Sequence, residues 1–106
     1  MTTFLFSYRM RKDYVPGRAD VMDRWTSWFE GMGGDLVDTG NPTLPSEVPG
    51  DAGPDSALGG YSILRAADLD AAIALAEGCP ALTEGGGVEV GVITRLDGRG
   101  KEQGDG

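Results

Sequence analysis

The chain of 106 residues carries 17 acidic and 9 basic side chains, a formal net charge of −8, and it contains one cysteine and no histidine. This length suits a single domain, and the charge argues against nucleic acid as a partner because every phosphate contact would oppose the protein's own field. The residue counts also exclude an internal disulfide and most zinc sites, so neither a metal nor a cofactor is expected.

No stretch has the pattern of a secretory signal, and no apolar run approaches the length of a membrane span. We therefore expect a cytoplasmic protein that does not bind membranes. Residues 1–96 are expected to form the domain, and the polar, glycine-rich residues 97–106 a disordered tail.

Two elements are expected in the first third of the chain. A strand over residues 3–8 would place alternate aromatic side chains on one face. After a basic loop (9–17), apolar residues recur every three or four positions, which predicts an amphipathic helix over about residues 18–32. The apolar stripe of this helix consists of Val21, Trp25, Trp28, Phe29 and Met32.

A short strand is expected over residues 35–39, before Gly40, Asn41 and Pro42 break it. Residues 42–58 then form a proline-rich, acidic loop without a hydrophobic period. A loop of this length inside a small domain is either functional or mobile.

Residues 59–94 predict a β-α-β unit. A strand over 61–66 precedes a helix with Asp68 as its N-cap. Gly78, in a left-handed conformation, and Pro80 are expected to end that helix. Alternating valines predict the last strand over 88–93.

The resulting order, β-α-β-β-α-β, predicts an α+β, ferredoxin-like fold with an antiparallel sheet and both helices on one face. The other face would still carry apolar side chains from the strands. Because such a face is a liability in water, we expect two chains to pair through it as a homodimer.

Three segments between Gly59 and Ile93 stand out together: GGYSIL, DLDAAIALAEGCP and GGGVEV. The first half adds a strand ending in Tyr8, a tryptophan-rich helix and the segment LVDTGNP. In this collinear set, which covers most of residues 3–94, the chain resembles the YCII-related family (YciI-like, DGPF-type).

The resemblance implies a dimeric α+β barrel of ferredoxin-like subunits, with a cleft between the sheet, the first helix and the loop before the last strand. Members of this family are regarded as possible enzymes related in fold to muconolactone isomerases. Those with a proposed acid-base pair use a histidine and an aspartate. This chain has Trp25 where that histidine is expected, and DAGPDSALGG in place of the DGPF tetrapeptide.

Without histidine, proton transfer near neutral pH needs a carboxylate with a raised pKa, a tyrosine or the thiol. Asp38 is the best carboxylate candidate, because a shared inward face with Leu36 would desolvate it and raise its pKa. The alternative is a sheet edge, where Asp38 would be solvated. Tyr8 and Tyr61 are further polar candidates, and Asn41 is a candidate ligand contact.

Cys79 is a candidate nucleophile, but it follows the C-terminus of a helix, whose negative end raises the pKa of a thiol. The alternative is a small buried apolar residue. Trp25 and Trp28 are expected either to pack the first helix on the sheet or to line the cleft as an apolar wall for a ring-containing ligand. Trp25 is the stronger candidate for that wall.

A basic cluster gives a separate hypothesis. The strands over 3–8 and 61–66 are expected to run parallel, which would bring Arg9 and Arg65 to one end of the sheet near both helix N-termini. Such a place suits a small carboxylate or phosphate, with Arg9 as the anchor. The alternative is a solvated loop that offsets the acidic surface. The glycines at 85–87 lack a following helix, so a turn is expected there and not a phosphate loop.

Two functions from different classes remain open. The first is a cofactor-free acid-base enzyme, isomerase- or lyase-like, that acts on a small molecule in the cleft. The second is a non-catalytic module that binds a small ligand or another protein, which the missing histidine favours. For both, the expected partners are a second copy of the chain and a small anionic or ring-containing ligand.

Overall fold

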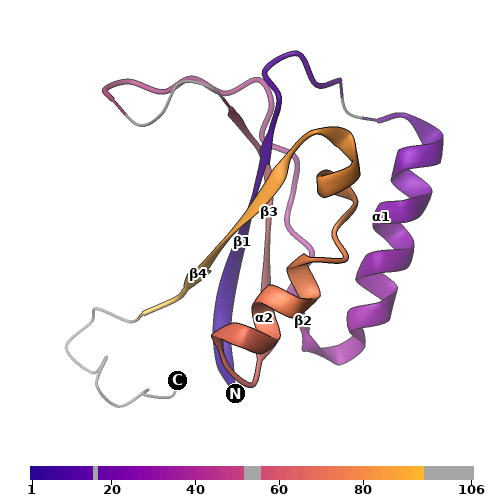
Figure 1. Ribbon diagram of the computed structural model, residues 1–106, viewed down its shortest axis with the longest axis vertical. Coiled ribbons are helices and arrows are strands. Elements are labelled where there is room, and N and C mark those ends of the chain that lie inside the picture. Colours follow the sequence, from indigo (N-terminus) through magenta and orange to yellow (C-terminus); the bar gives the residue numbers. More distant parts are fainter. Residues whose placement is uncertain (16, 52–55, 95–106) are drawn as a thin grey trace.

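The computed structural model describes residues 1–15, 17–51 and 56–94. Four strands form one antiparallel sheet in the order β2-β3-β1-β4 (Figure 1). The strands are β1 (Thr2–Met10), β2 (Leu36–Asp38), β3 (Ala57–Ala66) and β4 (Gly87–Val92), and the helices are α1 (Ala19–Met32) and α2 (Leu69–Ala76). Two short 3₁₀ segments, η1 (Gly33–Asp35) and η2 (Pro80–Glu84), follow the helices. The chain therefore has the predicted α+β, ferredoxin-like fold.

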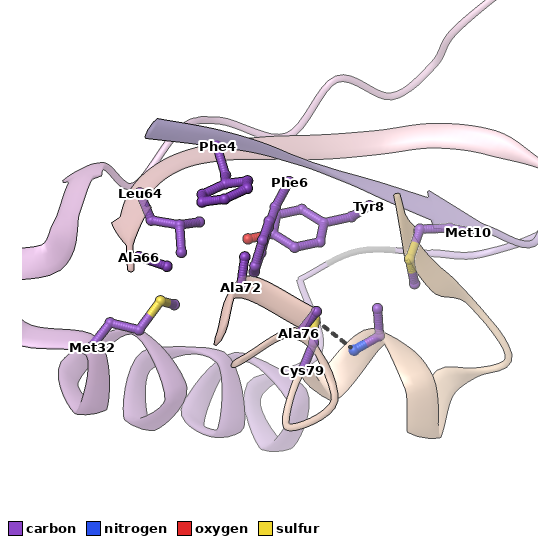
Figure 2. Packing of buried hydrophobic residues seen from close by; sticks show 11 residues of the cluster. Phe4, Phe6, Tyr8, Met10, Met32, Leu64, Ala66, Ala72, Ala76 and Cys79 are labelled. Atoms are coloured by element: carbon purple, nitrogen blue, oxygen red, sulfur yellow. Dashed lines mark hydrogen bonds between the residues drawn. The ribbon is translucent and has the colours of Figure 1, made fainter. Parts of the chain in front are cut away.

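Both helices lie on one face of the sheet, and the core fills the space between the two layers (Figure 2). Phe4, Phe6 and Tyr8 point into this space from β1, as their alternation predicts. Val88 and Val90 on β4 stand opposite Tyr8 and Phe6 in the register, so they add to the same face. Trp28 stacks on Phe6 with ring centroids 6.1 Å apart and joins α1 to this core.

The N-cap prediction for α2 is confirmed, because the Asp68 carboxylate accepts a hydrogen bond of 2.8 Å from the amide of Ala71. The predicted left-handed conformation of Gly78 is wrong, since Gly78 is not among the glycines with positive φ. Tight turns from the Gly78 amide to the Leu75 carbonyl and from the Cys79 amide to the Ala76 carbonyl close this helix end instead. At the end of α1, Gly33 does adopt a positive φ, of 56°.

The expectation that the first and third strands run parallel is also wrong, because β1 and β3 pair antiparallel. The crossover through α1 returns β2 parallel to β1, and β3 runs opposite to its neighbour β2, so β3 must also oppose β1. Arg9 consequently stands opposite Leu58, while Arg65 stands opposite Thr3 at the other end of the sheet.

Strand β3 begins at Ala57, four residues earlier than Tyr61, where the sequence predicts it. Its register against β1 shifts between Tyr8 and Arg9, so that Gly59 is left as an extra residue in a β-bulge. Beyond β2, Pro42 forms an isolated bridge with Gly60, which holds the start of the long loop against the sheet. The predicted tail at 97–106 and part of the acidic loop lie outside the described residues. Neither α1 nor α2, the helices of the described part, is long and apolar enough to cross a bilayer.

Candidate ligand-binding site

A cavity of about 250 Å³ lies between the end of β1, α1 and the chain segment that links β2 to β3. These parts meet at the end of the sheet where β1 ends and β3 begins (Figure 1). Of the predicted site residues, Tyr8, Trp25, Asn41 and Tyr61 line this cavity. The predicted cleft is placed correctly against the sheet and α1, but the loop that borders it precedes β3 and not β4.

Aromatic rings form the wall on the side of α1. The Trp25 indole meets the ring of Tyr8 edge to face, with centroids 4.7 Å apart and an interplanar angle of 79°. Phe29, one helical turn further along α1, lies 5.7 Å from Trp25. Edge-to-face pairs hold aromatic rings in defined orientations, so these side chains form a firm apolar wall. Met10 and Met22 add flexible thioethers to it.

Bare backbone forms the opposite wall. A Cβ on Gly40 would overlap the Tyr61 carbonyl oxygen, and a Cβ on Gly59 would overlap the Met10 side chain. At Gly60 a Cβ would come within 3.1 Å of the Asn41 carbonyl oxygen. Gly40 and Gly60 thus let the segment after β2 lie close against β3, while Gly59 leaves room for the Met10 side chain of β1.

A buried chain of hydrogen bonds fixes Tyr8. Its hydroxyl donates to the Ser62 hydroxyl over 2.8 Å, and Ser62 donates in turn to the Thr39 carbonyl over 2.5 Å. A carbonyl oxygen only accepts, so the direction of both bonds is set. Through Ser62, these two hydrogen bonds connect the central strand β1 to Thr39, which itself lines the cavity.

Tyr8 and Tyr14, which both line the cavity, are poor proton acceptors near neutral pH. Burial is the largest cause that raises the pKa of Tyr8, and the hydrogen bond to Ser62 offsets it only in part. Burial also raises the pKa of Tyr14, with a smaller contribution from Glu84. Among the described residues that line the cavity there is no carboxylate, thiol or amine. The cavity thus offers shape, apolar surface and hydrogen-bonding groups, and no base suited to neutral pH.

Asn41 and Tyr61 supply polar groups at the cavity rim. The Asn41 amide donates to the Tyr61 hydroxyl over 3.2 Å, and this bond is exposed to solvent. Asp38 stands just outside the cavity. Asp38 is exposed, which agrees with the alternative that it lies at a solvated sheet edge. Its carboxylate accepts a 2.8 Å hydrogen bond from the amide of Gly40. In this position Asp38 holds the turn that forms part of the cavity wall.

Cys79 and Trp28 lie away from the cavity, in an open groove of about 560 Å³ between α1 and η2. Cys79 is only 2% exposed, and its sulfur caps η2 by accepting a 3.4 Å bond from the Ala81 amide (Figure 2). Burial raises the pKa of this thiol to about 12, so the groove holds no ready nucleophile at neutral pH. The Trp28 indole donates to the Leu75 carbonyl over 3.1 Å and joins the two helices.

Arg9 also lies elsewhere. It alternates with Tyr8 along β1 and therefore points to the sheet face that the helices do not cover. There it borders a third hollow, together with Arg11 and the turn before β4. The structure thus distributes the predicted site residues over three hollows, with Asp38 outside all of them.

Several cavity residues were not predicted from the sequence: Met10, Tyr14, Met22, Phe29, Thr39 and the glycines 40, 59 and 60. Met22 and Phe29 stand three and four positions from Trp25, a spacing that identifies them as neighbours on a helix. The glycine pair at 59 and 60, inside a strand pattern, signals a bulge or a close backbone approach. Nothing in the sequence pattern marks Thr39 as a partner of Ser62.

The fold and this cavity together define a ferredoxin-like α+β domain with a small pocket between sheet and helix. Comparison with protein families finds the YCII-related domain over residues 2–96, and the chain belongs to this family. A comparison with curated proteins gives no match.

One similar solved structure is 5-chloro-2-hydroxyhydroquinone dehydrochlorinase from Burkholderia phenoliruptrix AC1100, in complex with 2,5-dihydroxybenzoquinone. The two chains share 22% sequence identity over 91% of this chain and 97% of the other, with a TM-score of 0.59. At this identity the likeness shows a common fold.

Proposed function

We propose that this YCII-related protein binds a small ring-containing molecule in the cavity between β1 and α1. The observation that carries the proposal is the build of the cavity, with the rings of Tyr8, Trp25 and Phe29 on one side and glycine backbone on the other. Pockets for small molecules are typically apolar and aromatic, with a few polar groups that orient the ligand. Here the Asn41 side chain, whose amide also donates to the Tyr61 hydroxyl, is the polar group at the rim.

The cavity volume limits the size of the ligand. About 250 Å³ falls just below the usual range of sites for drug-sized molecules, so one ring with small substituents is the size class that fits. The similar dehydrochlorinase is bound to 2,5-dihydroxybenzoquinone, a molecule of this class, which supports the choice.

Calorimetric titration with hydroquinone and 2,5-dihydroxybenzoquinone tests this proposal. The informative pair of variants is Trp25→Leu and Trp28→Leu, two identical changes on one helix: Trp25 lines the cavity, whereas Trp28 packs on Trp25 and Phe29 from outside it. We expect saturable binding by the wild-type protein, and a dissociation constant at least tenfold higher, about 1.4 kcal/mol, for Trp25→Leu.

The Trp28→Leu variant, once circular dichroism has shown that it is folded, is expected to weaken binding clearly less than Trp25→Leu, because Trp28 supports the wall without lining the cavity. Binding that both variants weaken equally would point to a general effect on the fold, and the proposed site would be wrong. Absence of binding for both probes would also contradict the proposal.

A second candidate function is acid-base catalysis on a ligand of the same kind. The observation that favours it is Asp38, which bonds the amide of the cavity-lining Gly40 and is the carboxylate that the sequence singles out. Release of chloride from 5-chloro-2-hydroxyhydroquinone, measured with wild-type protein and Asp38→Asn, distinguishes the two functions. Catalysis requires a release that depends on Asp38, whereas a binding protein leaves the uncatalysed rate unchanged.

We further propose that the protein acts as a homodimer, paired through the sheet face that carries no helix. Leu5 and Ile63 stand opposite each other on this face, with Tyr61 beside them. An apolar sheet face is stabilised when a second copy covers it.

A further inference from the structure

We propose a second binding site, for a small oxyanion such as inorganic phosphate, at the end of β1 on the face away from the helices. A hollow of about 180 Å³ is bordered there by Arg9, Arg11, Ser56 and the turn at residues 85–87. This site is separate from the ring-binding cavity, to which neither arginine contributes.

Arg9 is held in place with part of its hydrogen-bonding capacity unused. Its Nε donates to the Ser56 hydroxyl over 3.1 Å, and its Nη2 donates to the Ser56 carbonyl over 3.4 Å. A guanidinium carries five N–H donors, and within the described residues both hydrogens of Nη1 and one of Nη2 have no partner. Within the described residues Arg9 forms no ion pair. A partly buried, oriented arginine of this kind suits an oxyanion, which its planar donors can bind in a bidentate way.

Arg11 supplies the second positive charge. Its Nε and Nη2 bond the Asp13 carboxylate over 3.0 and 2.7 Å, which leaves Nη1 available. Both side chains of this pair are more than half exposed, and exposed pairs contribute little because water screens them. An oxyanion can therefore bind Nη1 of Arg11 directly. It can also replace the Asp13 carboxylate at Nε and Nη2, because that exposed ion pair is weak.

The glycine turn packs closely against the end of β1, next to both arginines. Gly85 has a φ of +80°, and a Cβ there would lie 2.8 Å from Cδ of Arg11. A Cβ on Gly86 would lie 2.5 Å from the Arg9 carbonyl oxygen. With glycine at both positions, the turn packs directly on the end of β1, from which both arginines extend. The glycine run is the turn that the sequence predicts, and the charge of the site comes from the arginines.

The class of ligand follows from charge. Two guanidinium groups favour a compact anion with several oxygens and more than one negative charge over a single carboxylate. The chain as a whole carries a net charge of −8, which opposes any anion at long range. Binding is therefore expected to be detectable at low ionic strength and to weaken as salt screens the contacts.

Titration of ¹⁵N-labelled full-length protein with inorganic phosphate at low, constant ionic strength tests the proposal. We expect saturable shifts of the Nε–H signals of Arg9 and Arg11 and of the amides at 85–87. Arg9→Gln should weaken phosphate binding at least tenfold. Arg65→Gln is the matched control, because Arg65 lies at the opposite end of the sheet and donates to the Gly34 carbonyl. It should leave the affinity unchanged.

The proposal is overturned if the shifts do not saturate, or if Arg9→Gln and Arg65→Gln bind phosphate as the wild type does. It is also overturned if phosphate does not bind and Arg9→Gln lowers the mass measured by light scattering, since the hollow then belongs to a contact between two copies. No ring compound takes part in this titration, so its result is independent of the function proposed for the cavity.

Discussion

Gly40 is the residue at which the cavity wall tolerates least change. It has a φ of +82°, and a Cβ would overlap the carbonyl oxygen of Tyr61, which is backbone and cannot rotate away. We expect Gly40→Ala to lower the free energy of unfolding by at least about 3 kcal/mol, because strain and overlap act together. Urea unfolding followed by circular dichroism measures this change.

Gly31 provides the opposite case for the same substitution. It lies inside α1, has no positive φ, and a Cβ there would have no atom within 4 Å. Alanine favours the helix over glycine by about 1 kcal/mol, so Gly31→Ala should stabilise the protein slightly. If Gly40→Ala and Gly31→Ala lowered the free energy of unfolding by similar amounts, the close approach between Gly40 and the Tyr61 carbonyl oxygen would be contradicted.

At the scale of single elements, the α2 helix depends on its N-cap. The Asp68 carboxylate satisfies the Ala71 amide over 2.8 Å, and no side-chain cap closes the start of α1. Replacement of Asp68 by alanine is expected to lower the free energy of unfolding by about 1 kcal/mol, while Asp70→Ala, also in the first turn, should change it by only a few tenths. Thermal unfolding of the two variants checks this difference, and equal losses would contradict the capping role.

The helices and strands are the features that the sequence predicts best. The aromatic stripe of α1 and the alternation at Phe4, Phe6 and Tyr8 are local periodicities, and they indicate directly which face each element buries. The choice of Trp25 as a cleft residue rests instead on the family resemblance, because Trp25 stands where the histidine of the family is expected.

The rest of the site depends on contacts that no local period contains. The segment at Thr39 and Gly40 reaches the cavity because Pro42 pairs with Gly60 across the sheet, and Ser62 binds Thr39 over 23 positions. Cys79, by contrast, is buried, as the alternative of a small apolar residue predicts. Which loop lies over a strand is decided by pairing between distant segments, and a pattern read along the chain does not record it.

For the molecule as a whole, two buried acids link stability to alkaline pH. Burial raises the pKa of the Cys79 thiol from 9.0 to about 12, and it raises the pKa of Tyr8 as well. Above pH 9 the unfolded chain releases a proton that the folded chain retains, so the free energy of unfolding should fall as pH rises from about 9 to about 12. Urea unfolding at a series of pH values measures the slope, and it should be shallower for Cys79→Ala. Identical slopes for both proteins would contradict this assignment.

The uncovered face of the sheet decides the state of the whole molecule in solution. Both helices of the described residues cover the same face of the sheet (Figure 2). On the other face Leu5 stands opposite Ile63 on the two central strands. Light scattering at micromolar concentration is expected to give twice the mass of the chain. Ile63→Lys should shift the protein to monomers, because two copies of the variant would bury unpaired charges against each other. Ile73→Lys places the same change on α2, where Ile73 is already 40% exposed, and should leave the dimer intact. If wild type and Ile63→Lys have the same mass, the sheet face is not the interface, and its apolar side chains are simply tolerated in water.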